Sequence, residues 1–525
     1  MIKKYSHLFN QQKFFIYLII LIVLLVYFKS FFHGLVFLDD DSLLYIKFKW
    51  LGLDEKISLA FTSNYLGIHY YRPITLLSII TDLLIGGQSF FIYHFTNVIL
   101  HLLTSILIFV ILRKLDIPNF ISFLTTLLFA LNPIQINAVG WIAGRGDLLA
   151  GFFSAAALLI FINFINNNKT YLLILVSFLL VMSILSKETA LLLPFLFGGF
   201  YFIEKKNYTL NKDAAGILIM IAAVLGFYYL LRGLILSGVY IDKFSFTTYY
   251  KNILVLPETV SKFFIPVGIK ALPTIEMFTS IAGLIIFFLL LTLPMMLKKI
   301  NALRYYFGLF WIVFLLLPGM VTRTMMQDGF YYWDCRSYLP IFGFIFIISE
   351  FLKTYSSQNG YRYFVLTGFY ILILGVVTFH KITLYESPLT YWNSVKADYS
   401  SSFLPYIGLF NYYDFNGYSE KAEEQLREAI KIRPEELSIR TQLINSYVKH
   451  KLSAKALAML KNTLIDEKIY SDYLADKYLT MLDESEKTVE LNKLFNTYKA
   501  YPLIVNKINK IKSDLIRKEI SHEKL

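Results

Sequence analysis

The run FFIYLIILIVLLVYFK, residues 14–29, decides the class of fold. It is almost wholly apolar, and a helix needs about 20 such residues to cross a bilayer. Similar runs of about 16 to 22 residues recur along the chain. Hydrophobic residues make up 56% of the 525 residues. No small-residue cleavage site follows the first run, so we expect an anchor rather than a removed signal peptide. The sequence predicts a polytopic, all-α membrane protein.

Composition excludes several other classes. Cys335 is the single cysteine, which rules out an intramolecular disulfide framework and a cysteine-based zinc site. The net charge of +13 is explained by Lys and Arg in cytoplasmic loops and by a Lys-rich tail. We therefore expect a lipid bilayer, and no nucleic acid, as a partner.

Eleven apolar runs are candidate spans: residues 14–30, 92–112, 119–137, 148–166, 171–185, 189–203, 214–234, 277–297, 303–319, 337–353 and 363–379. Keeping the N-terminal lysines in the cytoplasm puts the short Lys- and Arg-bearing loops inside as well. This topology requires that residues 252–268 do not cross the membrane. It predicts a cytoplasmic N-terminus, a large first outer loop at residues 31–91 and an extracytoplasmic C-terminus.

The chain changes character near residue 385, which predicts a membrane domain at 1–384 and a second domain at 385–525. Charged and apolar residues alternate there at helical spacing. Ala422, Ala429 and Pro434 occupy the small-small-proline positions of a tetratricopeptide (TPR) repeat, and Pro502 lies two 34-residue periods later. A generic bundle of helical hairpins is the alternative to this TPR-like domain.

Unusual polar residues all fall on the predicted outer face. Asp39-Asp40-Asp41 follow the first span, where three adjacent carboxylates repel one another and attract cations. His94, Asn97 and His101 share one helix face by their spacing. The remaining members are Arg72, Trp141, Arg145, Asp147, Lys187, Glu188, Asp334 and Arg336, together with His69, Arg323 and Asp328. Ionisable groups near span ends are candidates for function because burial without partners is costly.

Structural roles are open for each of these residues. The aspartates can belong to a solvated loop, and the histidines can satisfy interhelical hydrogen bonds. Lys187 with Glu188, or Arg145 with Asp147, can form ion pairs in tight turns. Arg72 can extend its side chain to the interface.

Several strings resemble the TMTC family of membrane proteins with tetratricopeptide repeats. They are Tyr71-Arg72-Pro73-Ile74-Thr75, Tyr93-His94-Phe95-Thr96-Asn97 with His101, Asn132-Pro133 ahead of Trp141-Ile142-Ala143-Gly144-Arg145-Gly146-Asp147-Leu148-Leu149-Ala150, Ser186-Lys187-Glu188 and Arg336-Ser337-Tyr338-Leu339-Pro340. The resemblance covers about residues 30 to 345. It implies protein O-mannosylation and the GT-C class of polyprenyl-phosphate-sugar glycosyltransferases. One departure is Cys335, which stands where the family usually has Glu.

The resemblance implies a catalytic acid in the first outer loop, where Asp39 and Asp40 lie. Sugar transfer to a hydroxyl needs a base, and adjacent like charges raise the pKa of at least one carboxyl. The departing lipid phosphate needs cationic donors, for which Arg145, Lys187, Arg336 and Arg72 are the candidates in that order. We expect substrate-binding or supporting roles for a further set: Asp41, His94, Asn97, His101, Trp141, Asp147, Glu188 and Asp334.

The leading hypothesis is an inverting glycosyltransferase in the plasma membrane. It would move mannose or another hexose from a polyprenyl-phosphate donor to Ser or Thr of exported proteins, which the repeats would recruit. No cofactor is required, and a divalent cation bound by carboxylates is a second possibility. A lipid-linked-glycan transporter or flippase and a non-catalytic repeat scaffold are the alternatives from other classes.

Overall fold

The structure is a computed structural model that describes residues 12–46, 51–63, 70–87, 89–206, 211–236, 252–297, 299–321, 333–482, 484–501 and 504–509. The elements in these ranges are helices. The chain forms two compact units, Met1–Val395 and Lys396–Leu525. His69, Arg323, Asp328 and Pro502 lie outside the described residues.

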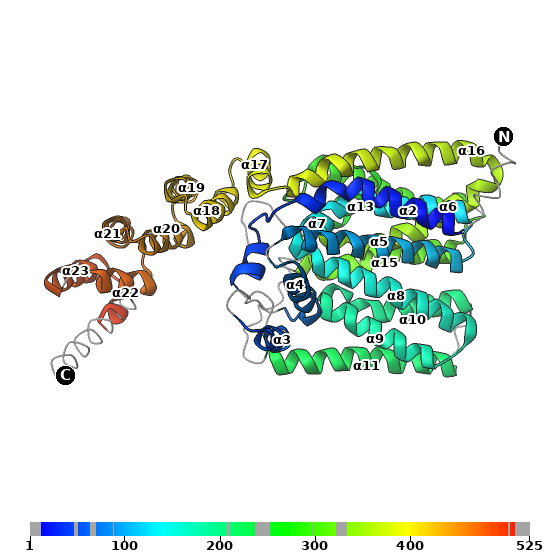
Figure 1. Cartoon of the computed structure of the whole chain (residues 1–525), viewed down its shortest axis with the longest axis horizontal. Coiled ribbons are helices and arrows are strands. Elements are labelled where there is room, and N and C mark those ends of the chain that lie inside the picture. Colours follow the sequence, from blue (N-terminus) through cyan, green and yellow to red (C-terminus); the bar gives the residue numbers. More distant parts are fainter. Residues whose placement is uncertain are drawn as a thin grey trace. The chain divides into compact units, whose positions relative to one another are not determined.

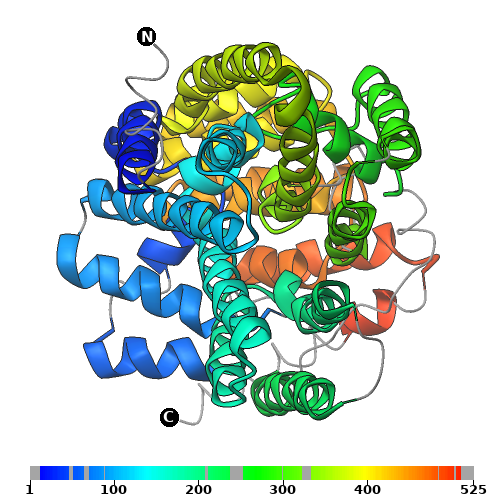
Figure 2. The ribbon, with the colours of Figure 1, turned by 90° about the vertical axis from the view of Figure 1, so that its right-hand side faces the viewer.

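The first unit is a helical bundle (Figure 1). Its longer helices are α2 (Gln12–Tyr27), α3 (Leu53–Thr62), α4 (Pro73–Gly86), α5 (Phe90–Lys114), α6 (Asn119–Ala130), α7 (Ile136–Gly140), α8 (Arg145–Asn167), α9 (Tyr171–Ser186), α10 (Leu193–Lys205), α11 (Lys212–Ile235), α13 (Val255–Phe264), α14 (Met277–Met296), α15 (Ala302–Leu316), α16 (Ile341–Lys381) and α17 (Pro388–Asp398). Short helical turns join them: η1 (Phe28–Phe32), η2 (Ser42–Ile46), η3 (Pro133–Gln135), η4 (Ile142–Gly144), η5 (Glu188–Leu192), η6 (Leu317–Val321), η7 (Asp334–Ser337) and η8 (Ile382–Tyr385). Figure 2 looks along the bundle and shows its helices side by side.

The multi-pass character predicted from the sequence is confirmed. Among the described residues, seven helical segments are long and apolar enough to cross a membrane: Gln12–Phe32, Phe90–Lys114, Ile142–Asn167, Lys212–Ile235, Met277–Met296, Ala302–Met320 and Tyr361–Tyr385. The pair Asn119–Ala130 and Pro133–Gly140 makes an eighth if it is one span bent by 47°. The predicted count of eleven is therefore reached only if α9, α10 and the first half of α16 also cross.

The helix α16 doubles back on itself. A straight helix from Ile341 to Thr378 would be about 55 Å long. Yet Tyr338, just before this helix, hydrogen-bonds His101, which in turn bonds the carbonyl of Ala130, while Thr378 donates to the neighbouring carbonyl of Leu131. Both ends of α16 therefore lie at the same end of the bundle, so its two halves run in opposite directions.

The segment predicted not to cross contains α13, whose ten residues cover about 15 Å, half the thickness of a hydrocarbon core. The helix is largely buried, and its last two carbonyls accept from Asn132 at 3.1 Å and Tyr370 at 2.6 Å. Gly283 of α14 lies against it so closely that an added Cβ would sit 1.8 Å from the Pro257 carbonyl oxygen. The absence of a side chain at Gly283 permits this close contact.

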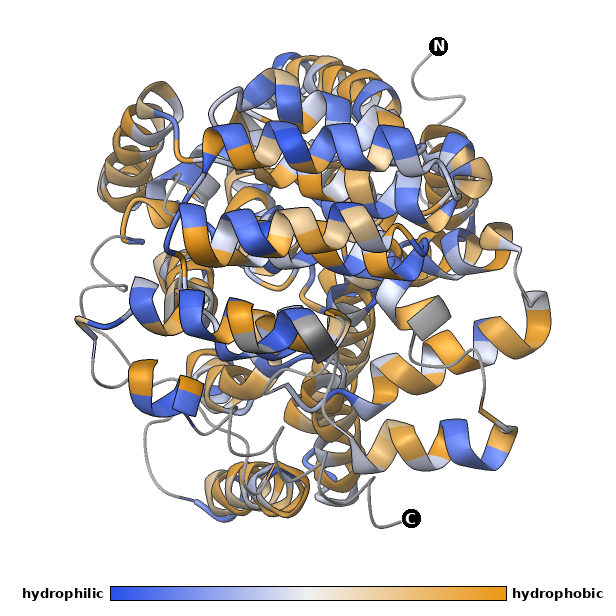
Figure 3. Cartoon of the chain, turned by 90° about the vertical axis from the view of Figure 1, so that its left-hand side faces the viewer, coloured by the Kyte–Doolittle hydropathy of each residue, from blue (hydrophilic) through white to orange (hydrophobic). Residues whose placement is uncertain are grey.

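The second unit is a succession of helical hairpins. It contains α18 (Leu404–Phe415), α19 (Ser419–Ile432), α20 (Leu437–Lys449), α21 (Ser453–Lys461), η9 (Asn462–Asp466), α22 (Asp472–Met481) and α23 (Glu484–Thr497). Each helix packs against the next in sequence. Figure 3 shows its helices as mixed hydrophilic and hydrophobic ribbons. Ala422, Leu426, Ala429 and Ala456 are fully buried in its core, which explains the helical spacing of its apolar residues.

Candidate active site

The carboxylate of Asp40 organises the turn that follows the first span. Its Oδ2 accepts from the backbone N–H of Val36 at 2.8 Å, and its Oδ1 accepts from those of Leu38 at 3.2 Å and Asp41 at 3.1 Å. Asp40 is 1% exposed. Burial raises its pKa to about 6, against the opposing effect of the Val36 and Leu38 N–H groups. Both oxygens of Asp40 are thus engaged with its own loop.

Asp39 is the more accessible neighbour. It is partly exposed, and its backbone carbonyl accepts from Leu43. Burial, then the charges of Asp40 and Asp41, raise the pKa of Asp39 to about 7, while Arg72 opposes the rise. Asp41 is also partly exposed, and burial raises its pKa. Asp39 therefore combines accessibility with a pKa near neutrality.

One face of α5 supports three segments of the site. The Nε2 of His94 lies 3.2 Å from the carbonyl oxygen of Gly34. Gly34 begins the segment Gly34–Asp41, which we call the aspartate turn. Asn97 donates to the Trp141 carbonyl at 3.0 Å, and His101 contacts the Tyr338 hydroxyl at 2.8 Å. All three side chains are buried. The predicted shared face thus orients neighbouring backbone and side-chain groups.

Arg145 is not placed to bind a phosphate. Its side chain is fully buried, ion-pairs with Asp82 at 2.6 Å, and donates to Ser78 at 2.7 Å and to the Tyr93 carbonyl at 2.8 Å; it also bonds Asn97. Protein acceptors therefore surround the guanidinium, which argues against the expected rank of Arg145 as first phosphate donor. Arg145 joins α8 to α4 and α5.

A second cationic group lies between the start of α8, the end of α9 and η7. Lys187 forms an ion pair with Asp147. Burial raises the pKa of the Cys335 thiol, Asp147 acts in the same direction, and the charges of Lys187 and Arg336 oppose the rise. Arg336 is partly exposed, and its Nη1 donates to the Gly319 carbonyl at 3.1 Å. Lys187, Asp147 and Arg336 were expected on the same side of the membrane, and in the structure they lie around Cys335.

Arg72, just before α4, is bound to the start of η5. Its Nε bonds Glu188 at 2.8 Å, and Glu188 also accepts from the backbone of Tyr71 at 3.1 Å. Both side chains of the pair are partly exposed. The charge of Arg72 also lowers the pKa of Asp39, so the guanidinium lies within electrostatic range of that carboxylate.

Asp334 and Trp141 face different neighbours. Asp334 lies 3.1 Å from the Nζ of Lys262 in α13, which is itself 3.7 Å from Glu258, and all three are buried. The Trp141 ring stacks on Trp333 at 5.4 Å. Sequence reasoning did not assign Lys262 or Glu258 to the site. The feature of the sequence that could have identified Lys262 and Glu258 is their charge within an otherwise apolar run.

Tyr391 of α17 lies within electrostatic range of both charged groups. Burial raises its pKa well above the usual value, and Tyr385, Asp40, Asp39 and Cys335 act in the same direction. Sequence reasoning missed this residue, which lies about 350 positions after the aspartates.

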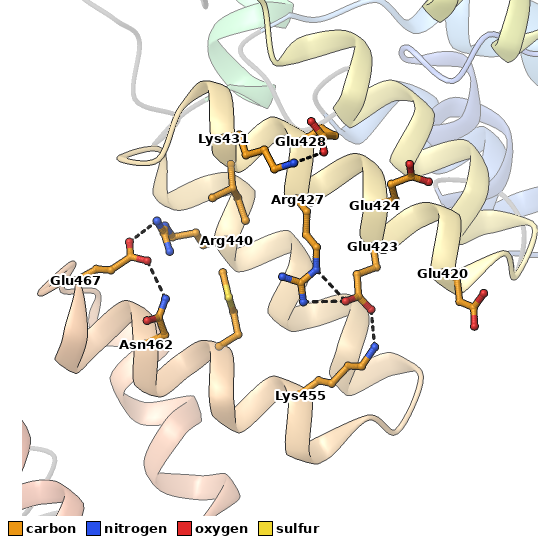
Figure 4. Close-up of a pocket in the computed structure, with 12 residues that line it drawn as sticks. Glu420, Glu423, Glu424, Arg427, Glu428, Lys431, Arg440, Lys455, Asn462 and Glu467 are labelled. Atoms are coloured by element: carbon orange, nitrogen blue, oxygen red, sulfur yellow. Dashed lines mark hydrogen bonds and ion pairs between the residues drawn. The ribbon is translucent and has the colours of Figure 1, made fainter.

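The second unit carries a groove of about 590 Å³ between α19, α20 and α21 (Figure 4). Acidic and basic side chains line it. Glu423 bonds both Arg427 at 2.8 Å and Lys455 at 2.7 Å, and Arg440 pairs with Glu467. Within the described part of the chain, no group of three or more His, Cys, Asp or Glu side chains is arranged to hold a metal ion.

The chain is similar over part of its length to proteins named protein O-mannosyl-transferase. It is 33% identical to TMTC3 of Homo sapiens over 150 residues, which is 27% of this chain and 16% of TMTC3. It is 38% identical to TMTC1 of Mus musculus over 81 residues (15% and 9%), and 34% identical to Tmtc1 of Drosophila melanogaster over 122 residues (23% and 14%). Each match spans less than a fifth of the relative. No family profile matches the chain. The resemblance to TMTC proteins that the motif strings indicated is confirmed by these relatives.

Proposed function

We propose that the chain is a GT-C-type glycosyltransferase that moves mannose from a polyprenyl-phosphate donor to Ser or Thr hydroxyls of exported proteins. One observation carries the proposal: a partly exposed carboxylate with a raised pKa, Asp39, lies within electrostatic range of Arg72 just after the first membrane-length helix. The similarity to proteins named protein O-mannosyl-transferase supports mannose as the sugar and protein as the acceptor.

In the proposed reaction, Asp39 is the general base. The acceptor oxygen attacks the anomeric carbon, the bond from that carbon to the phosphate oxygen breaks, and Asp39 takes the hydroxyl proton. Attack opposite the leaving phosphate inverts the anomeric centre. The pKa of about 7 supports this role, because a base works best when its pKa lies near the working pH. Asp40 keeps the turn in place rather than taking the proton.

Arg336, Lys187 and Arg72 are the proposed partners of the lipid phosphate. The leaving phosphate gains negative charge as the bond breaks, so prearranged cations stabilise the transition state. Lys187 is paired with Asp147 and Arg72 with Glu188, and these carboxylates hold the two cations in place. No step of this reaction requires a metal ion.

The second unit is the proposed acceptor-binding domain, built as two to three TPR-like repeats. The starts of α18, α20 and α22 lie 33 and 35 residues apart, close to the 34-residue period of such repeats. Stacked helix pairs provide a binding surface, and the groove along α19 is the site that we assign to the acceptor chain (Figure 4). This assignment puts the unit on the extracytoplasmic side of the plasma membrane, together with the aspartates.

The test is transfer of labelled mannose from mannosyl-phosphoryl-polyprenol to a Ser/Thr-rich peptide library by the full chain in nanodiscs. We expect Asp39→Asn to lower kcat about 10²–10⁴-fold, as loss of a general base does. Asp54→Asn, at an exposed aspartate of α3, is the matched control and should keep most of the activity. Full transfer by Asp39→Asn would exclude the proposed mechanism. Absence of transfer by the unaltered chain, with lipid translocation instead, would favour a flippase.

A further inference from the structure

The aspartate turn is held by residues from the far end of the first unit. The backbone N–H of Gly34 donates to the carbonyl of Glu386 at 2.9 Å. The indole Nε1 of Trp392 donates to the carbonyl of Val36 at 2.7 Å, across 356 positions of sequence. Val36 in turn donates its N–H to the Asp40 carboxylate at 2.8 Å. A single residue, Val36, thus connects Trp392 to Asp40.

The bond from Trp392 fixes a backbone turn that is costly to form. Phe37, directly after the Val36 carbonyl, has φ 56°, the left-handed region that bulky residues rarely adopt. Such a conformation persists only where the surroundings over-determine it. Val36 and Trp392 are each 1% exposed, so water cannot replace the indole as a donor.

Trp392 is itself fixed in place. It packs edge-on against Tyr391 with ring centroids 5.0 Å apart, and the Tyr391 hydroxyl donates to the Ala271 carbonyl at 3.2 Å. The Tyr385 hydroxyl lies 3.3 Å from the same carbonyl oxygen. The donor that reaches the aspartate turn therefore projects from a packed cluster of aromatic rings.

We infer that Trp392 is a positioning residue for the reaction, because its indole N–H sets the geometry of the Val36–Asp41 turn and so the position of the Asp39 carboxylate. This inference rests on the proposed function of Asp39. It assigns α17 a part in catalysis although none of its side chains touches substrate. A displacement of about 1 Å at a reacting group can cost about 10²-fold in rate.

The test uses the full chain in nanodiscs with labelled mannosyl-phosphoryl-polyprenol and the peptide library. Trp392→Phe keeps a buried ring and removes the donor. Trp311→Phe is the matched control: Trp311 is also buried and donates its Nε1 to a carbonyl, that of Leu339, at 2.9 Å. We expect Trp392→Phe to lower kcat about 10- to 100-fold while the KM for donor and peptide stay within about 2-fold. Trp311→Phe should keep kcat within about 3-fold at a similar loss of thermal stability.

Equal kcat values for the two variants would overturn the inference. If Trp392→Phe does not accumulate, benzothienylalanine at position 392 keeps the ring size and removes only the N–H, and the same fall in kcat is expected. Unchanged kcat in that protein would also overturn it. Asp39→Asn distinguishes failure of the positioning role from failure of the proposed function. If Asp39→Asn is inactive while Trp392→Phe is fully active, only the role of Trp392 is wrong. If Asp39→Asn is active, the proposed function itself is wrong.

Discussion

Asp39 and Asp40 are adjacent, but their carboxylates have different surroundings. Three backbone N–H groups occupy the Asp40 oxygens, whereas Asp39 is partly exposed and within electrostatic range of Arg72. In the sequence, both residues follow the end of a span, and nothing there favours one of them as the general base. The difference arises from the backbone turn at Phe37, which depends on contacts with residues about 350 positions away.

The raised pKa of Asp39 predicts how activity depends on pH. A base must be ionised, so we expect kcat/KM to fall as the pH drops through about 7. Asp41→Asn should move this inflection to lower pH, because the Asp41 charge helps to raise the pKa of Asp39. Profiles from about pH 5 to 9 in the same transfer assay measure both effects.

The contribution of Asp39 to the free energy of unfolding should fall as the pH rises, whereas kcat/KM should increase. A carboxyl with a raised pKa stabilises the fold when it is protonated, so this contribution is lost as the pH rises from about 4 to about 7. Asp39→Asn should therefore be at least as stable as the unaltered chain at pH 8. A flat activity profile between about pH 5 and 8 would contradict the assignment of Asp39 as the base.

Arg145 and Arg336 should respond differently to the same change. Arg145→Met leaves Asp82 buried without its cation, which typically costs about 3–5 kcal/mol, so we expect much less folded protein. Arg336→Met should fold and raise the KM for the lipid donor about 10-fold or more, as loss of one charge-assisted contact does. Detergent-extracted yield and donor titration measure the two effects. A stable Arg145→Met protein with a raised donor KM would restore Arg145 to the phosphate site.

Among the secondary-structure elements, the helices were located well from apolar runs, because the thickness of a bilayer sets how many apolar residues a spanning helix needs. The run at 252–268 was expected not to cross, and α13 is too short to do so. Two features of the fold could not be predicted from the sequence. The reversal inside α16 and the contact of α13 with α14 depend on partners distant in the chain, Leu131 and Gly283, which periodicity cannot identify.

The contact at Gly283 predicts a specific packing defect. Gly283→Ala places a Cβ against the Pro257 carbonyl, so α13 and α14 must separate, at about 1–3 kcal/mol or more. Gly226 of α11 is the matched control, since an added Cβ there meets nothing within 4 Å and should gain helix propensity. Apparent Tm in nanodiscs should fall for Gly283→Ala and stay level or rise for Gly226→Ala. Equal Tm values would show that the helices do not approach this closely.

Across the first unit as a whole, two groups of paired charges lie at opposite ends of the helical bundle. Arg304 bonds Glu204, Glu350 and the Leu115 carbonyl at the end where α5 finishes with Arg113 and Lys114. The aspartates, Lys187 and Arg336 gather beyond the opposite end of α5, around His94 and Asn97. The positive-inside rule predicts that the end with Arg304, Arg113 and Lys114 faces the cytoplasm. A rule based on loop charge cannot identify which cations become buried in the fold, as Arg145 does.

The single buried cysteine makes the predicted orientation measurable. Cys335 is 2% exposed and burial raises the pKa of its thiol, so the unaltered chain should react little with a membrane-impermeant maleimide. Ser438→Cys in the second unit and Ala302→Cys beside Arg304 both introduce exposed thiols. We expect Ser438→Cys to be labelled in intact cells and Ala302→Cys only after the membrane is opened. The reverse pattern would put the aspartates and the lipid phosphate site on the cytoplasmic side, where exported proteins would have to be modified before they leave.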